Sequence, residues 1–135
     1  MKSICIFLSI VLLAAASNAG SLPKVQEVLN CSFNKNRIII YEFSGSPAIN
    51  EINAYLAKNR PTYTAGRFTA AYFFKKGSSI PRSGQSLCES ISKANEILYE
   101  SSQINSWDFA FMYDVDGKKV LVNCQTGTKS DLCRQ

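Results

Sequence analysis

The stretch WDFAFMYDVDGKKVLVNC, residues 107–124, carries the strongest indication of the fold. Aromatic residues occupy every second position over 107–113 and alternate with Asp, Ala and Met. This period of two is typical of a β-strand with one buried face. The apolar run 120–124 follows Asp116-Gly117, a dipeptide that suits the positive φ angles of a type I′ turn. The stretch therefore predicts an antiparallel hairpin.

Three further strands are expected upstream of this hairpin. The segment 27–33 alternates only in its second half, whereas 37–43 is a run of β-branched and aromatic residues. The turn-like residues 34–36 lie between these two segments, so we expect a hairpin over 27–43. The aromatic segment 67–76 predicts another strand with a charged end.

Two helices are expected between the strands. The first spans 47–58, with Ser46 as its cap and Pro47 as its first residue, and it places Ile49, Ile52 and Leu56 on one face. The second spans about 87–101, because Ser86 and Glu89 have the spacing of a capping box and Leu87, Ile91, Ala94 and Leu98 follow on one face. Together these elements predict an α+β fold in which one or two helices pack on one face of an antiparallel sheet.

The first 19 residues have the features of a secretory signal peptide. Lys2 is followed by an apolar run over residues 4–16 and by the small residues around Ala19, where we expect cleavage. The run is shorter than the roughly 20 residues of a membrane span, and the less favoured alternative is an uncleaved N-terminal anchor. Residues 20–135 then form a single domain, secreted and without a membrane anchor. Its overall composition, 46% hydrophobic and 19% charged, fits one ordinary globular domain.

Cysteine usage agrees with export. Cys5 leaves with the signal peptide, and the four remaining cysteines allow three pairings. A Cys31–Cys133 bridge would tie the ends of the domain and contribute about 4–5 kcal/mol through chain entropy. We therefore expect Cys31–Cys133, which leaves Cys88 with Cys124. No two cysteines have the spacing of a zinc ribbon or finger, so four-thiolate zinc binding is disfavoured and no metal is expected.

The absence of histidine limits the chemistry. Ser-His-Asp and Cys-His sites are impossible, and no glycine-rich phosphate-binding pattern occurs, so no cofactor is implied. Asp114 and Asp116 are the nearest carboxylate pair in a predicted loop, but aspartate is common there because it favours turns. Removal of residues 1–19 leaves 14 basic and 10 acidic residues, which is a net charge of +4.

This mildly basic charge offers a weak indication of RNA binding. The candidate RNA-binding residues flank the aromatic strand and the last hairpin turn, and are Lys75, Lys76, Arg82, Lys118 and Lys119. Arg60 and Arg67 also bracket Tyr63. The alternative of a solvated basic surface over an aromatic core is favoured at this net charge. Asn30-Cys31-Ser32 is a glycosylation sequon, but its central cysteine is expected in a disulfide, so we expect no glycan there.

The order of these parts resembles a known family. A cysteine near the mature N-terminus, a helix, Pro61-Thr62-Tyr63 before an aromatic strand, Trp107-Asp108 opening another strand and a terminal cysteine are similar to the ribonuclease-like effectors secreted by powdery mildew fungi. Those effectors are similar in fold to small fungal guanyl-preferring ribonucleases. The helix expected over 87–101 has no counterpart in the simple ribonuclease fold.

The resemblance implies the scaffold without the enzyme. Phe109 follows Asp108 where the ribonucleases have a phosphate-contacting arginine, and Gln125 precedes Thr126-Gly127 where they have the catalytic histidine. Both differences remove charge chemistry that phosphoryl transfer needs. The implied function is a monomeric, non-enzymatic effector that binds host proteins or RNA, acts in or around host cells and is recognised by a plant immune receptor. A carboxylate-dependent ribonuclease or other hydrolase and a small secreted inhibitor or antimicrobial domain are the alternatives.

Overall fold

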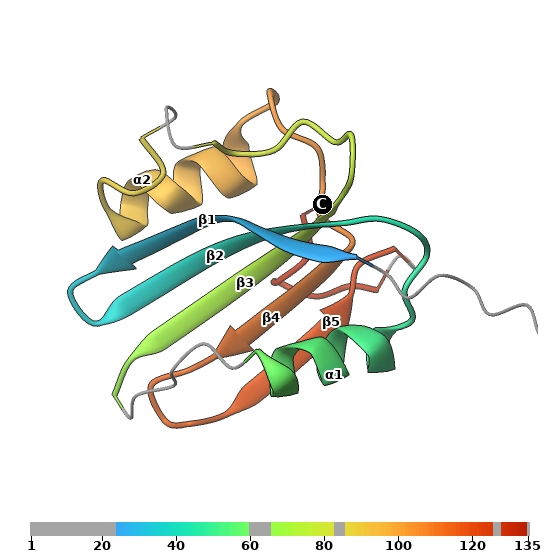
Figure 1. Ribbon diagram of the computed structural model, residues 1–135. Helices are drawn as coiled ribbons and strands as arrows, with labels where there is room; N and C mark the ends of the chain where they lie inside the picture. The colour runs from blue at the N-terminus through green and yellow to red at the C-terminus, as the bar shows by residue number, and fades with distance from the viewer. Residues whose placement is uncertain (1–23, 60–65, 83–85, 126–127, 135) are drawn as a thin grey trace, which may run out of the picture.

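A computed structural model describes residues 24–59, 66–82, 86–125 and 128–134. The predicted signal peptide, Arg60, the segment 61–63 and Thr126-Gly127 lie outside these residues. The described residues form five strands and three short helical segments (Figure 1). In chain order these are β1 Val25–Phe33, β2 Asn36–Phe43, α1 Ile49–Lys58, β3 Phe68–Lys75, α2 Ile91–Asn95, the π-helical turn η1 Glu96–Glu100, β4 Phe109–Tyr113 and β5 Lys119–Asn123. The predicted α+β class is confirmed, and all five strands lie within one residue or two of the expected segments.

The sheet is mixed rather than purely antiparallel. Its strand order is β1-β2-β3-β4-β5, and every neighbouring pair is antiparallel except β2 and β3. The β2–β3 pair is parallel, with Asn36 opposite Phe68 and Phe43 opposite Lys75. Parallel neighbours need a crossover connection, and α1 provides it. Strands β2 and β3 therefore begin at the same end of the sheet.

The helices lie on opposite faces of the sheet, which corrects the expectation of a single helical face (Figure 1). One core cluster contains Ile52 and Leu56 of α1 together with Ile39 and Phe73. The other contains residues of the opposite parity on the same strands, packed with Ala94 and Leu98 of α2 and η1. Strands β2 and β3 are buried on successive residues, over 38–41 and 69–74, so both of their faces are covered.

Both helix starts differ from the sequence expectation. Helix α1 begins at Ile49, and the Ala48 N–H donates to Glu51 Oε2 at 2.6 Å, so neither Ser46 nor Pro47 starts the helix. Ile49 is 40% exposed and does not share the buried face of Ile52 and Leu56. The Glu51 side chain therefore satisfies the backbone N–H group of Ala48 at the start of the helix, where the sequence predicts Ser46 as the cap.

The second helical segment is shorter than predicted. Ser86 has a φ of 58° and cannot open a helix, so the expected capping box with Glu89 does not form. Ser90 caps α2 instead, with its hydroxyl accepting from the Lys93 N–H at 3.1 Å. Leu87 is buried in the core ahead of the helix.

The last hairpin has a different turn from the expected type I′. Only Gly117 has a positive φ, of 86°, and its N–H donates to the Asp114 carbonyl at 3.1 Å. Asp114 Oδ1 accepts from the N–H groups of Asp116 and Lys118, at 3.0 and 2.8 Å. Asp114 therefore has the turn-forming role that the sequence indicates.

Four of the five cysteines lie in the described residues and form two disulfides, but the predicted pairing is wrong. The bonds are Cys31–Cys88 and Cys124–Cys133. Strands β1 and β5 are the opposite edges of the sheet, and four strand spacings separate them by roughly 19 Å. Cys31 in β1 and the residues after β5 are therefore too far apart, and each cysteine pairs at its own edge.

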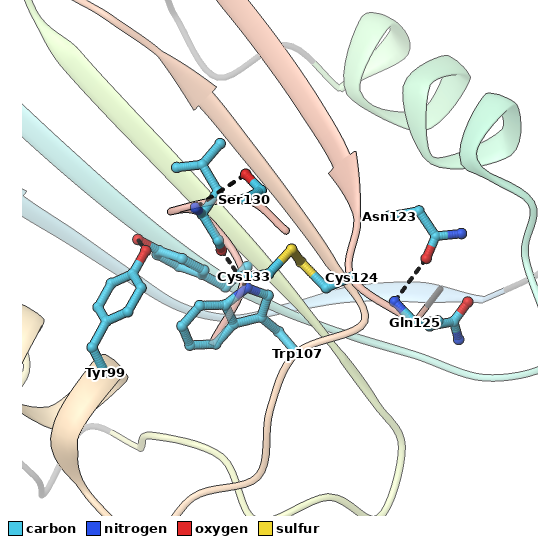
Figure 2. Close-up of a disulfide and its surroundings, with 9 residues drawn as sticks. Tyr99, Trp107, Asn123, Cys124, Gln125, Ser130 and Cys133 are labelled. Carbon is cyan, nitrogen blue, oxygen red and sulfur yellow. Dashed lines mark hydrogen bonds between the residues drawn. A yellow bond between two sulfur atoms is a disulfide. The ribbon is translucent and has the colours of Figure 1, made fainter. Parts of the chain in front are cut away.

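The C-terminal tail is held by a disulfide to the residue after β5 and by hydrogen bonds with the segment between η1 and β4. Figure 2 shows the Cys124–Cys133 disulfide beside Trp107, whose indole N–H donates to the Leu132 carbonyl at 2.8 Å. Arg134 also donates from Nη1 to the Ile104 carbonyl at 2.8 Å. Within the described ranges, no helix has the length and apolar character needed to cross a membrane.

Candidate anion-binding site

The five predicted RNA-binding residues divide between the two ends of the sheet. Lys75 lies opposite Phe43 where β2 and β3 finish, and Lys76 follows it. Lys119 lies opposite Tyr113 at the other end, where β2 and β3 begin. Lys118 precedes it, while Arg82 is exposed in the loop after β3. The predicted set therefore does not form one surface.

Three other cations gather where β2 and β3 begin, which we call the basic end of the sheet. Lys35 lies in the β1–β2 turn, Arg37 is the second residue of β2, and Arg67 immediately precedes β3. Arg37 is opposite Thr69 across the parallel pair, which brings the two arginines to neighbouring strand starts. In Figure 1 this is the end that holds the β1–β2 turn and the point of the β1 arrow.

These cations line one small cavity, the cation pocket, of about 120 Å³. Its remaining wall is polar, and the described residues that line it are Ser32, Asn34, Lys35, Asn36, Arg37, Arg67 and Thr69. Thr69 lies in the central strand β3 and is only 2% exposed, so it is a buried polar residue of this lining. The pocket thus combines three positive charges with hydroxyl and amide groups, which are suited to an oxyanion.

The Arg37 guanidinium is positioned by a short hydrogen-bond chain along β1. Arg37 Nε donates to Asn30 Oδ1 at 2.8 Å, and Asn30 Nδ2 donates to Glu27 Oε1 at 3.2 Å. Because Nε is the atom used, the two terminal nitrogens are left without a hydrogen bond among the described residues. A guanidinium held in this way presents a two-nitrogen edge that matches an oxyanion.

None of the described residues that line the cation pocket is acidic. The ion pair recorded in the described ranges joins Lys93 and Glu96 on α2 and η1, away from the pocket. Within the part of the chain that the structure describes, Lys35, Arg37 and Arg67 therefore have no carboxylate partner. Their mutual repulsion decreases when an anion binds between them.

A wider hollow shares the β1–β2 turn with the cation pocket but lies on the α2 face of the sheet. Its volume is about 720 Å³, and it lies between the β1–β2 turn and the residues that lead into α2. The turn contributes Ser32, Phe33, Asn34, Lys35 and Asn36, and the other side contributes Cys88, Glu89, Ser90 and Ile91. The Cys31–Cys88 disulfide joins the two sides, with a Cα–Cα distance of 5.0 Å. The bond therefore fixes one wall of the hollow against the other.

The two positions at which the resemblance implies lost catalytic residues do not form a site. Phe109 is 0% exposed and packs under α1, so it cannot contact a ligand. Gln125 is exposed; its Nε2 donates to Asp108 Oδ2 at 2.8 Å, and its N–H donates to Asn123 Oδ1 at 2.9 Å (Figure 2). In the described residues, no group of acidic or cysteine side chains is arranged to hold a metal.

Sequence reasoning missed Lys35 and Arg37 as site residues and assigned Arg67 to a different cluster. Lys35 and Arg67 are more than 30 positions apart in the sequence. No local pattern connects them or Arg37. A prediction that β2 and β3 are parallel would have been enough to bring these residues together, because the first residues of two parallel neighbouring strands lie at the same end of a sheet.

Comparison with known proteins identifies no protein that is similar to this chain. No family model matches the chain, and searches of curated proteins and of solved structures return no match.

Proposed function

We propose that this protein is a secreted effector that binds RNA through its phosphates and does not cleave it. The observation that carries the proposal is the cation pocket, where Lys35, Arg37 and Arg67 surround a polar cavity whose described lining residues include no acidic one. Neutralisation of phosphates by Lys and Arg supplies most of the sequence-independent affinity of proteins for nucleic acids.

The non-enzymatic part of the proposal rests on the missing proton-transfer groups. Cleavage of RNA through its 2′-hydroxyl requires a base and an acid, each typically contributing 10²–10⁴-fold. The chain contains no histidine, and Gln125 can donate a hydrogen bond but cannot deliver a proton. Asp108, its partner, is a carboxylate held in a hydrogen bond with that amide.

The effector role is supported by the family resemblance, and the two disulfides fit an extracellular protein. In that role the partners are host RNA and host proteins, including an immune receptor. The signal peptide over residues 1–19 gives secretion, followed by entry into host cells.

The test is RNA binding by fluorescence anisotropy at salt concentrations between about 50 and 200 mM. The variant Arg37→Gln/Arg67→Gln should bind more weakly and lower the log–log salt slope by about two, since each phosphate contact contributes about one. Lys75→Gln/Lys76→Gln is the matched control, with the same charge change at the opposite end of the sheet.

Equal loss of binding in the two double variants would contradict a site at the basic end. The same samples are incubated with total RNA, which should remain intact. Cleavage that disappears in Asp108→Asn would identify a carboxylate-dependent hydrolase instead.

A further inference from the structure

The cation pocket lies on the α1 face of the sheet and contains a buried hydroxyl group. Arg37 and Thr69 are directly opposite across the parallel β2–β3 pair, so their side chains are on the same face as Ile39 and Phe73, which pack under α1. Among the described residues, the Thr69 hydroxyl has no hydrogen-bond partner. No buried side-chain oxygen or nitrogen in these ranges is both unpaired and closed to solvent, so the hydroxyl opens to the cavity that Thr69 lines.

The volume of the pocket matches one phosphate group and not a whole nucleotide. About 120 Å³ is roughly the space of four water molecules in the liquid, at about 30 Å³ each. A phosphate group is of this size, whereas a nucleoside is several times larger. An internal phosphate of RNA carries a nucleoside on both sides, and both would have to leave the pocket in different directions. A terminal phosphate is attached through a single oxygen and can enter end on.

The charges and donors of the pocket favour a dianion. An internal phosphodiester has one negative charge and two oxygens that carry no ester bond, whereas a phosphate monoester has about −1.5 to −2 charges at pH 7 and three such oxygens. Arg37 can donate to two of them from its terminal nitrogens, because its Nε is bonded to Asn30 Oδ1. Lys35, Arg67 and the Thr69 hydroxyl supply donors for the third.

We propose that the cation pocket binds the terminal phosphate monoester of an RNA strand. The inference rests on the proposed RNA binding and deepens it, because it names the end of the strand as the group that the pocket recognises. A 5′ phosphate and a 3′ phosphate share this chemistry, and binding measurements separate them.

Positive charge continues from the pocket across the same face of the sheet. Thr69 is opposite Tyr113 and Tyr113 is opposite Lys119, so these residues extend the row that begins at Arg37. Lys119 is exposed, with its Nζ 5.9 Å from the centre of the Tyr113 ring. Three strand spacings, roughly 14 Å, separate it from Arg37. Lys119 can therefore meet a further phosphate of an RNA strand, which a peptide with a single phosphoserine lacks.

The experiment measures fluorescence anisotropy of a single-stranded RNA oligomer with an internal label, at one fixed salt concentration. The same sequence is prepared with a 5′ phosphate, with a 3′ phosphate and with hydroxyl groups at both ends. At least one phosphorylated oligomer should bind about tenfold more tightly than the hydroxyl-ended one, because charged hydrogen bonds are gained. Equal affinity of the three oligomers would overturn end recognition while RNA binding stands. If none of them binds, the proposed function fails as well.

Variants locate this preference in the pocket. Arg37→Gln should remove most of the preference for the phosphorylated end, and Thr69→Val should remove part of it, because only the hydroxyl is lost. Arg82→Gln is the matched control, since Arg82 is exposed in the loop after β3 and outside the lining. An equal loss of preference in Arg82→Gln would refute the pocket as its source. Should Arg37→Gln fail to fold, Lys35→Gln in the exposed turn carries the same expectation.

A peptide with one phosphoserine presents the same monoester from a protein. It should bind more weakly than the phosphorylated oligomer, and Lys119→Gln should weaken binding of the oligomer but not of the peptide. Equal affinity of the peptide and the oligomer would refute RNA as the ligand of the pocket.

Discussion

The two disulfides should differ in how much they stabilise the fold, because they close loops of very different length. Cys31–Cys88 joins residues 57 positions apart, whereas Cys124–Cys133 joins residues 9 positions apart. In the chain-entropy model these loops correspond to about 4.2 and about 2.6 kcal/mol at 25 °C. Cys31→Ala/Cys88→Ala should therefore lower the free energy of unfolding by roughly 1.6 kcal/mol more than Cys124→Ala/Cys133→Ala.

The burial of Cys31 also makes the loss of the Cys31–Cys88 bond more destabilising than the loss of the Cys124–Cys133 bond. Cys31 is 1% exposed in the core cluster that contains Leu98, so its replacement by alanine also leaves a small void. The bond moreover joins β1 to the segment that leads into α2, and no strand pairing connects these two elements. Its loss should shift Tm downward by on the order of 15 °C.

The assay is urea unfolding of each double variant and of the parent, followed by tryptophan fluorescence of Trp107. Non-reducing peptide maps of the parent first establish the pairs. A greater loss of stability in the short-loop variant would refute the entropy reasoning. A parent map that links Cys31 to Cys133 would refute the pairing itself.

Three further outcomes are expected. Ile52→Ala, at the centre of the α1 face, should cost about 2–5 kcal/mol in urea unfolding, whereas exposed Ile49→Ala should cost less than 1. Burial raises the pKa of Tyr72 well above its usual 10.0, so its contribution to stability is complete below pH 10 and is lost as pH rises; Tyr72→Phe should reduce alkaline unfolding in pH-dependent melting curves. Trp107→Phe leaves the Leu132 carbonyl without its donor and should cost about 1–3 kcal/mol in urea unfolding followed by circular dichroism, since this variant removes the single tryptophan; unchanged stability would contradict the anchoring role.

Local sequence determined the elements of this fold. The alternation over 107–113, the run 37–43 and the spacing of Ile52 and Leu56 are each read within about ten residues, because strand and helix periods are local properties. The same holds for the turn aspartate Asp114, whose hydrogen bonds reach only a few residues along the chain. The first residues of the helices were less predictable. Glu51 and Ser90 accept hydrogen bonds from N–H groups at the helix starts, whereas the sequence favours Ser46 and Ser86 as the caps.

The tertiary structure alone decided how these elements meet. The parallel β2–β3 pairing, the covering of both sheet faces and the assignment of cysteines to opposite edges depend on contacts between distant segments. The cation pocket follows from the same pairing, because it brings Arg37 and Arg67 together across 30 residues of chain. Periodicity specifies which face of an element is apolar but not which partner covers it, so several packings satisfy one pattern until the whole chain folds.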